Sequence, residues 1–232
     1  FVPKADRPFN LFCTTFQGSG SNRVDIGHAA DWAKFFSGSL KRDPVGGISI
    51  NMWIQPRDLA SMGADTDAGS GCLIAFNDHA SIFEGIRLEK VGHELRFFMG
   101  HSSGIFSEWE TSIAAEDGFV SGGTRFEKSG PRSSSGPFAD IDGNPRWVNI
   151  GVTKAFNHSA PRFYLNGQEF TAVSNSAGSS TPLQDFRATM VKHTSHQGAG
   201  NCSIGNHNYG QSQGNNIQTA LNCAIDAATI WS

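Results

Sequence analysis

The chain has 232 residues, of which 38% are hydrophobic, and its 18 Phe and 5 Trp supply enough apolar volume for a sizeable core. A net charge of −3 without a basic stripe argues against nucleic acid as a partner. The sequence contains no run of about 18 apolar residues, so no membrane span is expected. Since no linker separates two cores, we expect residues 1–232 to form a single domain.

The first third of the chain predicts three strands. Apolar residues from Asn10 to Phe16 lead into a turn, and a short second strand follows at Arg23–Ile26. Asp31–Phe36 fits either one helical turn or an irregular loop. Gly47–Gln55 alternates strictly, which is typical of a strand with one buried face. The residues expected on that face are Ile48, Ile50, Met52 and Ile54.

The middle of the chain predicts a strand, a hairpin and then a long segment rich in Gly and Ser. The expected strands are Cys72–Asn77, Phe83–Lys90 and Glu94–Met99, the last two forming the hairpin. Gly100–Asn144 contains two further short strands, at Ser107–Ser112 and Arg125–Glu127. A loop of this length inside a compact domain is usually functional or mobile.

The segment after it carries the clearest pattern. Val148, Ile150 and Val152 share one face of a strand. Asn166-Gly167 supplies the two positive-φ residues of a type I′ turn, which predicts a hairpin between Phe163–Leu165 and Gln168–Val173. The apolar face of such strands needs a second sheet to cover it. With the strands expected at Cys202–Gly205 and Ala220–Trp231, the chain predicts an all-β, antiparallel, two-sheet sandwich.

Several motifs in their order carry a resemblance. They are Ser49–Pro56 (SINMWIQP), Trp147–Thr153 (WVNIGVT), Phe163–Gly167 (FYLNG), Ser203–Gly205 (SIG) and Ala224–Trp231 (AIDAATIW), preceded by Phe16-Gln17-Gly18. This order resembles the laminin-G-like, concanavalin A-like lectin/glucanase superfamily over nearly the whole chain. The resemblance implies a jelly-roll sandwich with one concave sheet. It does not fix a function, because lectins, adhesins, glycosidases and viral coat modules share the fold.

The resemblance argues against an enzyme. Glycosidases of the superfamily carry Glu-x-Asp-x-x-Glu or a close variant on one strand, which places two carboxylates where one acts as nucleophile and the other as acid. Here Glu108-Trp109-Glu110 lacks the third acid, and Asp140-Ile141-Asp142 is followed by a turn sequence. No Gly-x-Ser-x-Gly motif is present. We therefore expect a non-enzyme, with glycoside hydrolysis as the weaker alternative.

Calcium is the cofactor that the resemblance implies. Many members hold an ion near the Phe-Asp-Gly-type turn and the Asp of the last strand, positions that correspond to Gln17 and Asp226. The ion needs six to eight oxygen ligands, and Gln17 supplies an amide where the family has a carboxylate. Other acidic and histidine-rich segments are better explained as turns and surface side chains: Asp65–Gly69, Asp140–Gly143, and His193, His196 and His207.

A glycan site is the binding site we expect, because amide and carboxylate groups beside an aromatic ring are the usual sugar ligands and sites of this kind lie on loops. The candidate residues are Asn77, Asp78, Trp109, Asn206, His207, Asn208, Tyr209 and Gln211. Ordinary turns remain the alternative for each of these segments.

The resemblance also predicts a disulfide. In the resembled fold Cys202 and Cys223 flank the same loop and run close together, so they would pair in an oxidising compartment. Cys13 and Cys72 would form the remaining pair. Four reduced thiols are expected instead if the protein is assembled in a cytosol.

Two functions are consistent with the sequence. The first is a non-catalytic, lectin-like module of a secreted or cell-surface protein, with a glycan or glycoprotein as partner. The second is a structural module of an assembly, such as a virion coat, a virion tail or an extracellular filament, in which the sandwich contacts copies of itself.

Overall fold

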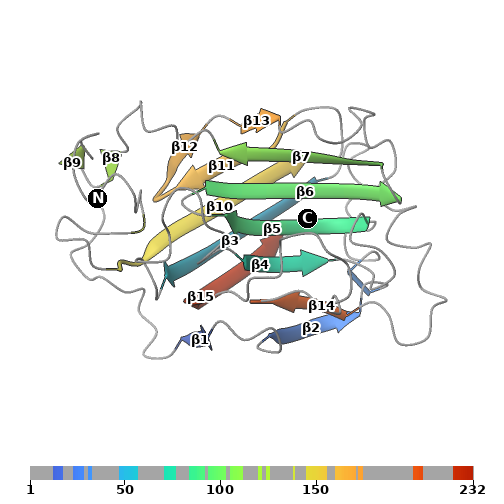
Figure 1. Cartoon of the computed structure of the whole chain (residues 1–232), viewed down its shortest axis with the longest axis horizontal. Helices are drawn as coiled ribbons and strands as arrows, with labels where there is room; N and C mark the ends of the chain where they lie inside the picture. Colours follow the sequence, from blue (N-terminus) through green and yellow to red (C-terminus); the bar gives the residue numbers. More distant parts are fainter. Residues whose placement is uncertain are drawn as a thin grey trace.

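The protein forms a β-sandwich in which two large antiparallel sheets face each other (Figure 1). The structure is a computed structural model. The residues that it describes are 13–17, 23–28, 31–32, 47–56, 71–76, 84–91, 94–102, 105–111, 120–121, 124–125, 138, 145–155, 160–170, 172–174, 201–205 and 222–231. The expected fold class is therefore confirmed. No helix within these ranges is long and apolar enough to cross a membrane.

Sheet A has six strands, with β3 near its centre. In spatial order they are β1 (Thr14–Gln17), β15 (Asn222–Trp231), β3 (Gly47–Pro56), β10 (Val148–Ala155), β11 (Arg162–Leu165) and β12 (Gln168–Phe170). The strand β3 runs antiparallel to both β10 and β15, so segments from the start, middle and end of the chain lie side by side.

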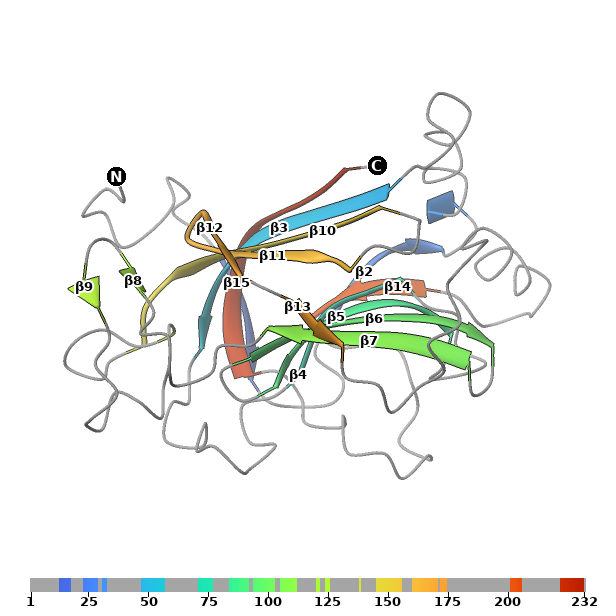
Figure 2. The same cartoon turned by 90° about the horizontal axis from the view of Figure 1, so that it is seen from above.

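Sheet B has seven strands, and Figure 2 shows it stacked on sheet A. In spatial order they are β13 (Ala172–Ser174), β7 (Ile105–Thr111), β6 (Glu94–Ser102), β5 (Glu84–Val91), β4 (Gly71–Phe76), β14 (Asn201–Ile204) and β2 (Val24–His28). A separate ribbon pairs β8 (Val120–Ser121) with β9 (Thr124–Arg125).

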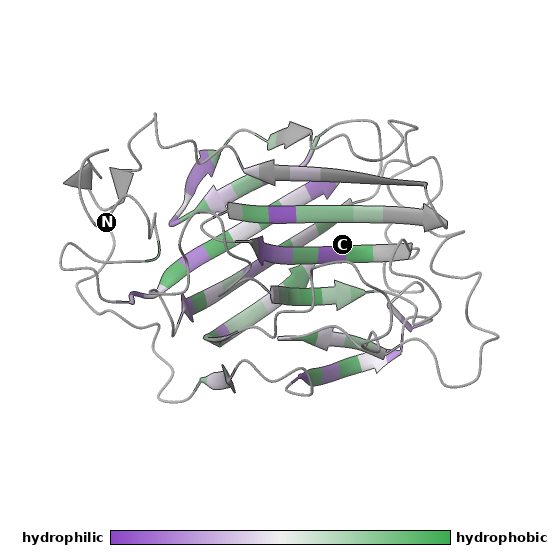
Figure 3. Cartoon of the chain, viewed as in Figure 1, coloured by the Kyte–Doolittle hydropathy of each residue, from purple (hydrophilic) through white to green (hydrophobic). Residues whose placement is uncertain are grey.

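The core lies between the two sheets, where the sequence pattern placed it. The inward-facing residues predicted for β3 and β10 are all at most 2% exposed: Ile48, Ile50, Met52, Ile54, Val148, Ile150 and Val152. Figure 3 shows the alternation of apolar and polar residues along both strands. Sheet B contributes Phe76, Leu88 and Phe97 from the opposite side. Each such side chain stabilises the fold by about 1.5–3 kcal/mol through burial.

The hairpin between β11 and β12 forms at the predicted turn. Asn166 has a φ of 49° and Gly167 a φ of 80°, the left-handed pair of a type I′ turn. The turn is also tied to the neighbouring strand, because the main-chain N–H of Asn149 donates to Oδ1 of Asn166 at 2.9 Å. This contact fixes the hairpin against β10.

The last strand contains a bulge that the sequence did not predict. Between Asp226 and Thr229 three steps of β15 face two steps of β3, and Ala227 has a φ of 49°. A one-residue shift exchanges the two faces of a strand. Beyond the bulge, Ile230 therefore packs against the core while Trp231 is 51% exposed on the outer side of sheet A.

Candidate functional site

Most of the glycan-binding residues expected from the sequence lie outside the described ranges. These are Asn77, Asp78, Asn206, His207, Asn208, Tyr209 and Gln211, and the acidic turns at residues 65–69 and 140–143 fall in the same category. Their roles stay predictions. The described strands nonetheless decide the position of the remaining candidates.

Trp109 belongs to the core side of sheet B. It packs against the hydrophobic cluster, and its ring centroid lies 6.4 Å from that of Phe97. From the opposite sheet, Nζ of Lys154 lies 5.5 Å from the same ring. The side chain of Trp109 thus contacts both sheets, and its role as a sugar-stacking ring stays a prediction.

No disulfide joins any of the four cysteines, all of which the structure describes. Cys202 lies on β14 of sheet B and Cys223 on β15 of sheet A, and both are buried. Burial raises the pKa of Cys202 to about 12, which keeps its thiol protonated and unreactive. The disulfides predicted for Cys202 with Cys223, and for Cys13 with Cys72, are not formed here. Pairing in an oxidising compartment stays a prediction.

Asp226 and Gln17 lie on neighbouring strands but at different levels. Gln17 pairs with Asn222, four positions before Asp226, so the two Cα atoms are separated by about 13 Å along the strand. One ion cannot bridge them directly. No group of three His, Cys, Asp or Glu side chains within the described ranges could hold a metal.

Asp226 also borders a cavity at the edge of the sandwich. The cavity has a volume of about 280 Å³, lies between β1, β2, β14 and β15, and is lined mainly by apolar side chains such as Phe16, Val24 and Ile204. Asp226 is the one carboxylate among the described residues of this lining. A single carboxylate does not supply the six to eight oxygen ligands that calcium requires. The described residues alone do not form a calcium site, so calcium at Asp226 stays a prediction. Calorimetric titration of wild type and Asp226→Asn with calcium tests this prediction.

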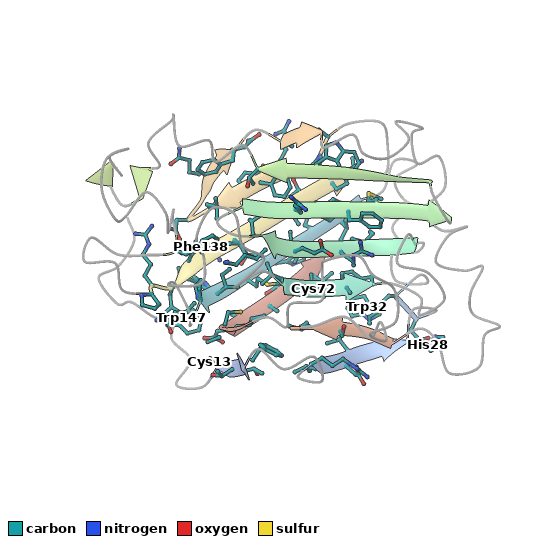
Figure 4. The ribbon with its side chains drawn as sticks, in the orientation of Figure 1. Cys13, His28, Trp32, Cys72, Phe138 and Trp147 are labelled. Carbon is teal, nitrogen blue, oxygen red and sulfur yellow. The ribbon has the colours of Figure 1, made fainter. Side chains whose placement is uncertain are left out.

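The outer face of sheet A gathers aromatic side chains that sequence reasoning did not assign to a site. Residues that alternate with the core positions of β3 and β10 point outward, and all of them except Gly151 are partly exposed. Four aromatic residues share this side: Trp53, Trp147, Tyr164 and Trp231. Figure 4 labels Trp147 near the start of β10. Three of the 5 tryptophans thus lie on one face of one sheet.

Two asparagines from distant parts of the sequence meet among these rings. Nδ2 of Asn51 donates to Oδ1 of Asn149 at 3.0 Å, and Nδ2 of Asn149 donates back to Oδ1 of Asn51 at 3.0 Å. Each amide therefore holds the other in a fixed orientation. Asn149 stands directly opposite Trp53, so the amide pair borders the indole ring. We call the set Trp53, Trp147, Tyr164, Trp231, Asn51 and Asn149 the aromatic–amide face.

The centre of the aromatic–amide face is uncharged. Its central row across the sheet reads Thr229, Asn51, Gly151, Tyr164 and Glu169. The only charge in this row is at the margin, where Glu169 lies 3.8 Å from Arg162 in an exposed ion pair. Trp53 and Tyr164 are two strands and two residues apart, or about 12 Å between Cα atoms. Charged groups border this central row, because Asp226 stands opposite Trp53 and the Glu169–Arg162 pair lies at the margin.

Comparisons with solved structures identify the fold. The binding domain of botulinum neurotoxin DC, in a complex with rat synaptotagmin II, matches 97% of this chain and 40% of its own length, with 12% identity and a TM-score of 0.50. The chain shares the β-sandwich fold of this binding domain. Mouse laminin alpha1 chain domains LG4-5 match 94% of this chain and 40% of their own, with 12% identity and a TM-score of 0.46. The chain spans about two fifths of the length of these structures. No protein-family model and no curated protein sequence matches.

The strand arrangement explains why the sequence alone did not indicate this face. Alternation in β3 places Trp53 opposite to Ile54, but it does not show whether that side is covered by another layer. The Asn51–Asn149 contact joins residues 98 positions apart, and it depends on β10 lying beside β3. The outward alternation of Trp53, Trp147 and Tyr164 was the available signal.

Proposed function

We propose that the protein is a non-catalytic glycan-binding module that binds its ligand through the aromatic–amide face. One observation carries this proposal: three tryptophans and a tyrosine share the outer side of sheet A with a hydrogen-bonded pair of asparagines. Such a module suits an extracellular or cell-surface protein, and its partner is a glycan or a glycoprotein.

Elementary chemistry supports a sugar as the ligand. A sugar ring has an apolar face of C–H groups and a rim of hydroxyls. Aromatic rings bury the apolar face, while Trp and Tyr keep a polar atom available for hydrogen bonding. The amide of Asn51 offers donor and acceptor capacity to hydroxyls, and it is already oriented by Asn149. This orientation lowers the entropic cost of binding.

The proposal does not depend on the similar structures. One of the similar structures is a binding domain in complex with rat synaptotagmin II, and another comes from work on cell entry of botulinum neurotoxin type C through interaction with two ganglioside molecules. Sequence identities of 12–14% show a common fold, and the fold alone leaves the ligand open. The chemistry of the aromatic–amide face supports a glycan as the ligand.

A structural module of an assembly, including a virion, is the second candidate. The exposure of Trp231 favours it, because exposed Trp side chains are enriched at protein–protein interfaces. The two candidates differ in solution behaviour. Self-association that is lost in Trp231→Ala, together with no detectable binding on a glycan array, would favour a structural module of an assembly.

We expect Trp53→Ala to weaken glycan binding at least tenfold. Removal of the indole takes away the ring beside Asn149, and tenfold corresponds to about 1.4 kcal/mol. Val24→Ala is the matched control, since Val24 is 41% exposed on β2 of the other sheet. A glycan array identifies the ligand, and calorimetry then compares the variants. Equal affinity of Trp53→Ala and wild type would refute the proposed face.

A further inference from the structure

The bulge in β15 contains backbone strain that burial of its own side chains does not offset. Ala227 has a φ of 49°, a left-handed conformation in which the Cβ of an L-residue lies too close to the following carbonyl oxygen. Ala227, Ala228 and Thr229 are all exposed. Strained residues of this kind cluster at ligand sites, so the bulge needs an explanation beyond packing of its own residues.

The bulge decides which way the end of β15 faces. Between Asp226 and Thr229 it inserts one residue relative to β3. Without that residue, Trp231 would stand opposite the core residue Ile48 and point between the sheets. With it, Trp231 stands opposite Ser49, on the outer side of sheet A.

Burial of apolar surface does not explain the bulge either. The regular register would bury the side chain of Trp231, whereas the bulged register places Ile230 against the core instead. An indole buries more area than an isoleucine side chain. The bulged register thus leaves the larger apolar side chain in solvent, and Trp231 is 51% exposed. An indole held in solvent by a strained backbone is available to a ligand.

The bulge gives the aromatic–amide face a second indole at a defined separation from Trp53. Figure 1 shows β3 and β15 side by side. Trp231 pairs with Ser49, so the two indoles are four positions apart along the strand direction and one strand apart across the sheet. Their Cα atoms are therefore separated by about 14 Å. One sugar ring is too small to stack on both side chains.

Hydrogen-bonding groups lie between the two indoles. Asn51 and Thr229 face each other in the intermediate row. The Nδ2 of Asn51 carries a second hydrogen beyond the one that it donates to Asn149. The exposed hydroxyl of Thr229 donates to the carbonyl of Ala227 at 3.3 Å, and its oxygen can also accept. An indole at each end with polar groups between them matches a row of linked sugar rings that carry hydroxyls along their edges.

We propose that Trp53 and Trp231 stack on two separate rings of one linear glycan that lies along β3 and β15, with hydroxyls of the intervening part bonded to Asn51 and Thr229. This inference rests on the proposed function and names the ligand class as a linear chain of several sugar units, in contrast to a single terminal sugar. The path is open to solvent at its described positions. Trp231 and Thr229 are exposed, and Trp53 is partly exposed.

The test measures how affinity depends on the length of the sugar chain. The probes are the disaccharide and the hexasaccharide of three neutral linear glycans: cellobiose with cellohexaose, laminaribiose with laminarihexaose, and chitobiose with chitohexaose. We expect wild type to bind a hexasaccharide at least about tenfold more tightly than the matching disaccharide, because only the longer chain contacts both indoles. Calorimetry measures both affinities.

Tryptophan variants separate the two contacts. Trp231→Ala should lose most of the advantage of the hexasaccharide while its affinity for the disaccharide stays near that of wild type, since a disaccharide binds at Trp53 beside the oriented amides. Trp231→Phe keeps an aromatic ring and should restore most of the advantage. Trp53→Ala should weaken binding of both probes. Val24→Ala, on the other sheet, is the control.

Several outcomes would overturn this inference and leave the proposed function standing, provided that Trp53→Ala still weakens binding. They are equal affinity of wild type for the two chain lengths, an unchanged hexasaccharide advantage in Trp231→Ala, and binding on a glycan array that is confined to branched or terminal sugars. Loss of self-association in Trp231→Ala without a change in glycan affinity would assign Trp231 to an interface between copies and would also overturn it. Failure of wild type to bind any probe or any arrayed glycan would overturn both this inference and the proposed function.

Discussion

Replacement of Gly205 by alanine is expected to lower the free energy of unfolding by about 3–4 kcal/mol. Gly205 follows β14, is buried, and has a φ of 89°. A Cβ at this position would lie 1.9 Å from Cε1 of Phe16, whose ring is 2% exposed in the core. Both the left-handed backbone and the overlap with the ring oppose a side chain. Urea denaturation measures the loss.

A second glycine separates the effect of the left-handed backbone from the effect of the overlap with the Phe16 ring. Gly167 has a φ of 80°, and a Cβ there would meet no atom within 4 Å. Gly167→Ala should therefore cost only the backbone strain, about 1–2 kcal/mol. If both alanine variants lose the same stability, the contact of Gly205 with Phe16 does not contribute as the structure implies.

Lys90→Met is expected to raise the free energy of unfolding at pH 7 by about 2 kcal/mol. Lys90 is 0% exposed, and its Nζ lies 5.2 Å from the ring of Phe138 inside the sandwich. Burial lowers the pKa of Lys90 to about 8, because desolvation penalises its charged form. Methionine keeps a similar length without carrying a charge into the core.

The effect of Lys90→Met should depend on pH in a defined direction. The pKa of Lys90 is about 8 in the folded state and about 10.4 in the unfolded chain, so the unfolded state binds more protons between these values. The contribution of Lys90 to the wild-type free energy of unfolding therefore rises as the pH increases from about 8 to about 10.4. The advantage of the variant should be largest at pH 7 and vanish near pH 10.4.

Comparison at each pH isolates Lys90 from other titrating groups. Burial lowers the pKa of Lys154 to about 8 as well, and it raises the pKa of Cys202 to about 12, which has the opposite effect on stability at high pH. Both groups are present in wild type and variant, so their contributions cancel in the difference. A difference that stays constant from pH 7 to 10 would contradict a buried, destabilised charge.

The sequence predicted the core because strand periodicity is local. Ile48, Ile50 and Val152 alternate with polar neighbours, and Asn166-Gly167 has the chemistry of one turn type. The bulge at Ala227 was not predictable in this way. It inserts a residue with a positive φ that is not glycine, and it reverses the faces of the residues that follow.

The candidate site was less predictable because it depends on strand order. Trp109 was a candidate sugar ligand as an aromatic residue, yet β7 packs it against Phe97. Neither Asn51 nor Asn149 belongs to a recognisable binding motif. Only the pairing of β3 with β10 brings their amides together. A surface formed by residues from several strands leaves no contiguous motif in the sequence.

The indole N–H signals of the five tryptophans test the central claim most directly. Trp53, Trp147 and Trp231 lie on the outer side of sheet A, whereas Trp109 packs between the sheets and the indole N–H of Trp32 donates to the carbonyl of Ile26 at 2.8 Å. The two-dimensional NMR spectrum is recorded during titration with the glycan that the array selects. We predict that the indole signal of Trp53 and the side-chain amide signals of Asn51 shift, while that of Trp32 does not. Shifts confined to Trp32 or Trp109 would contradict binding at the aromatic–amide face.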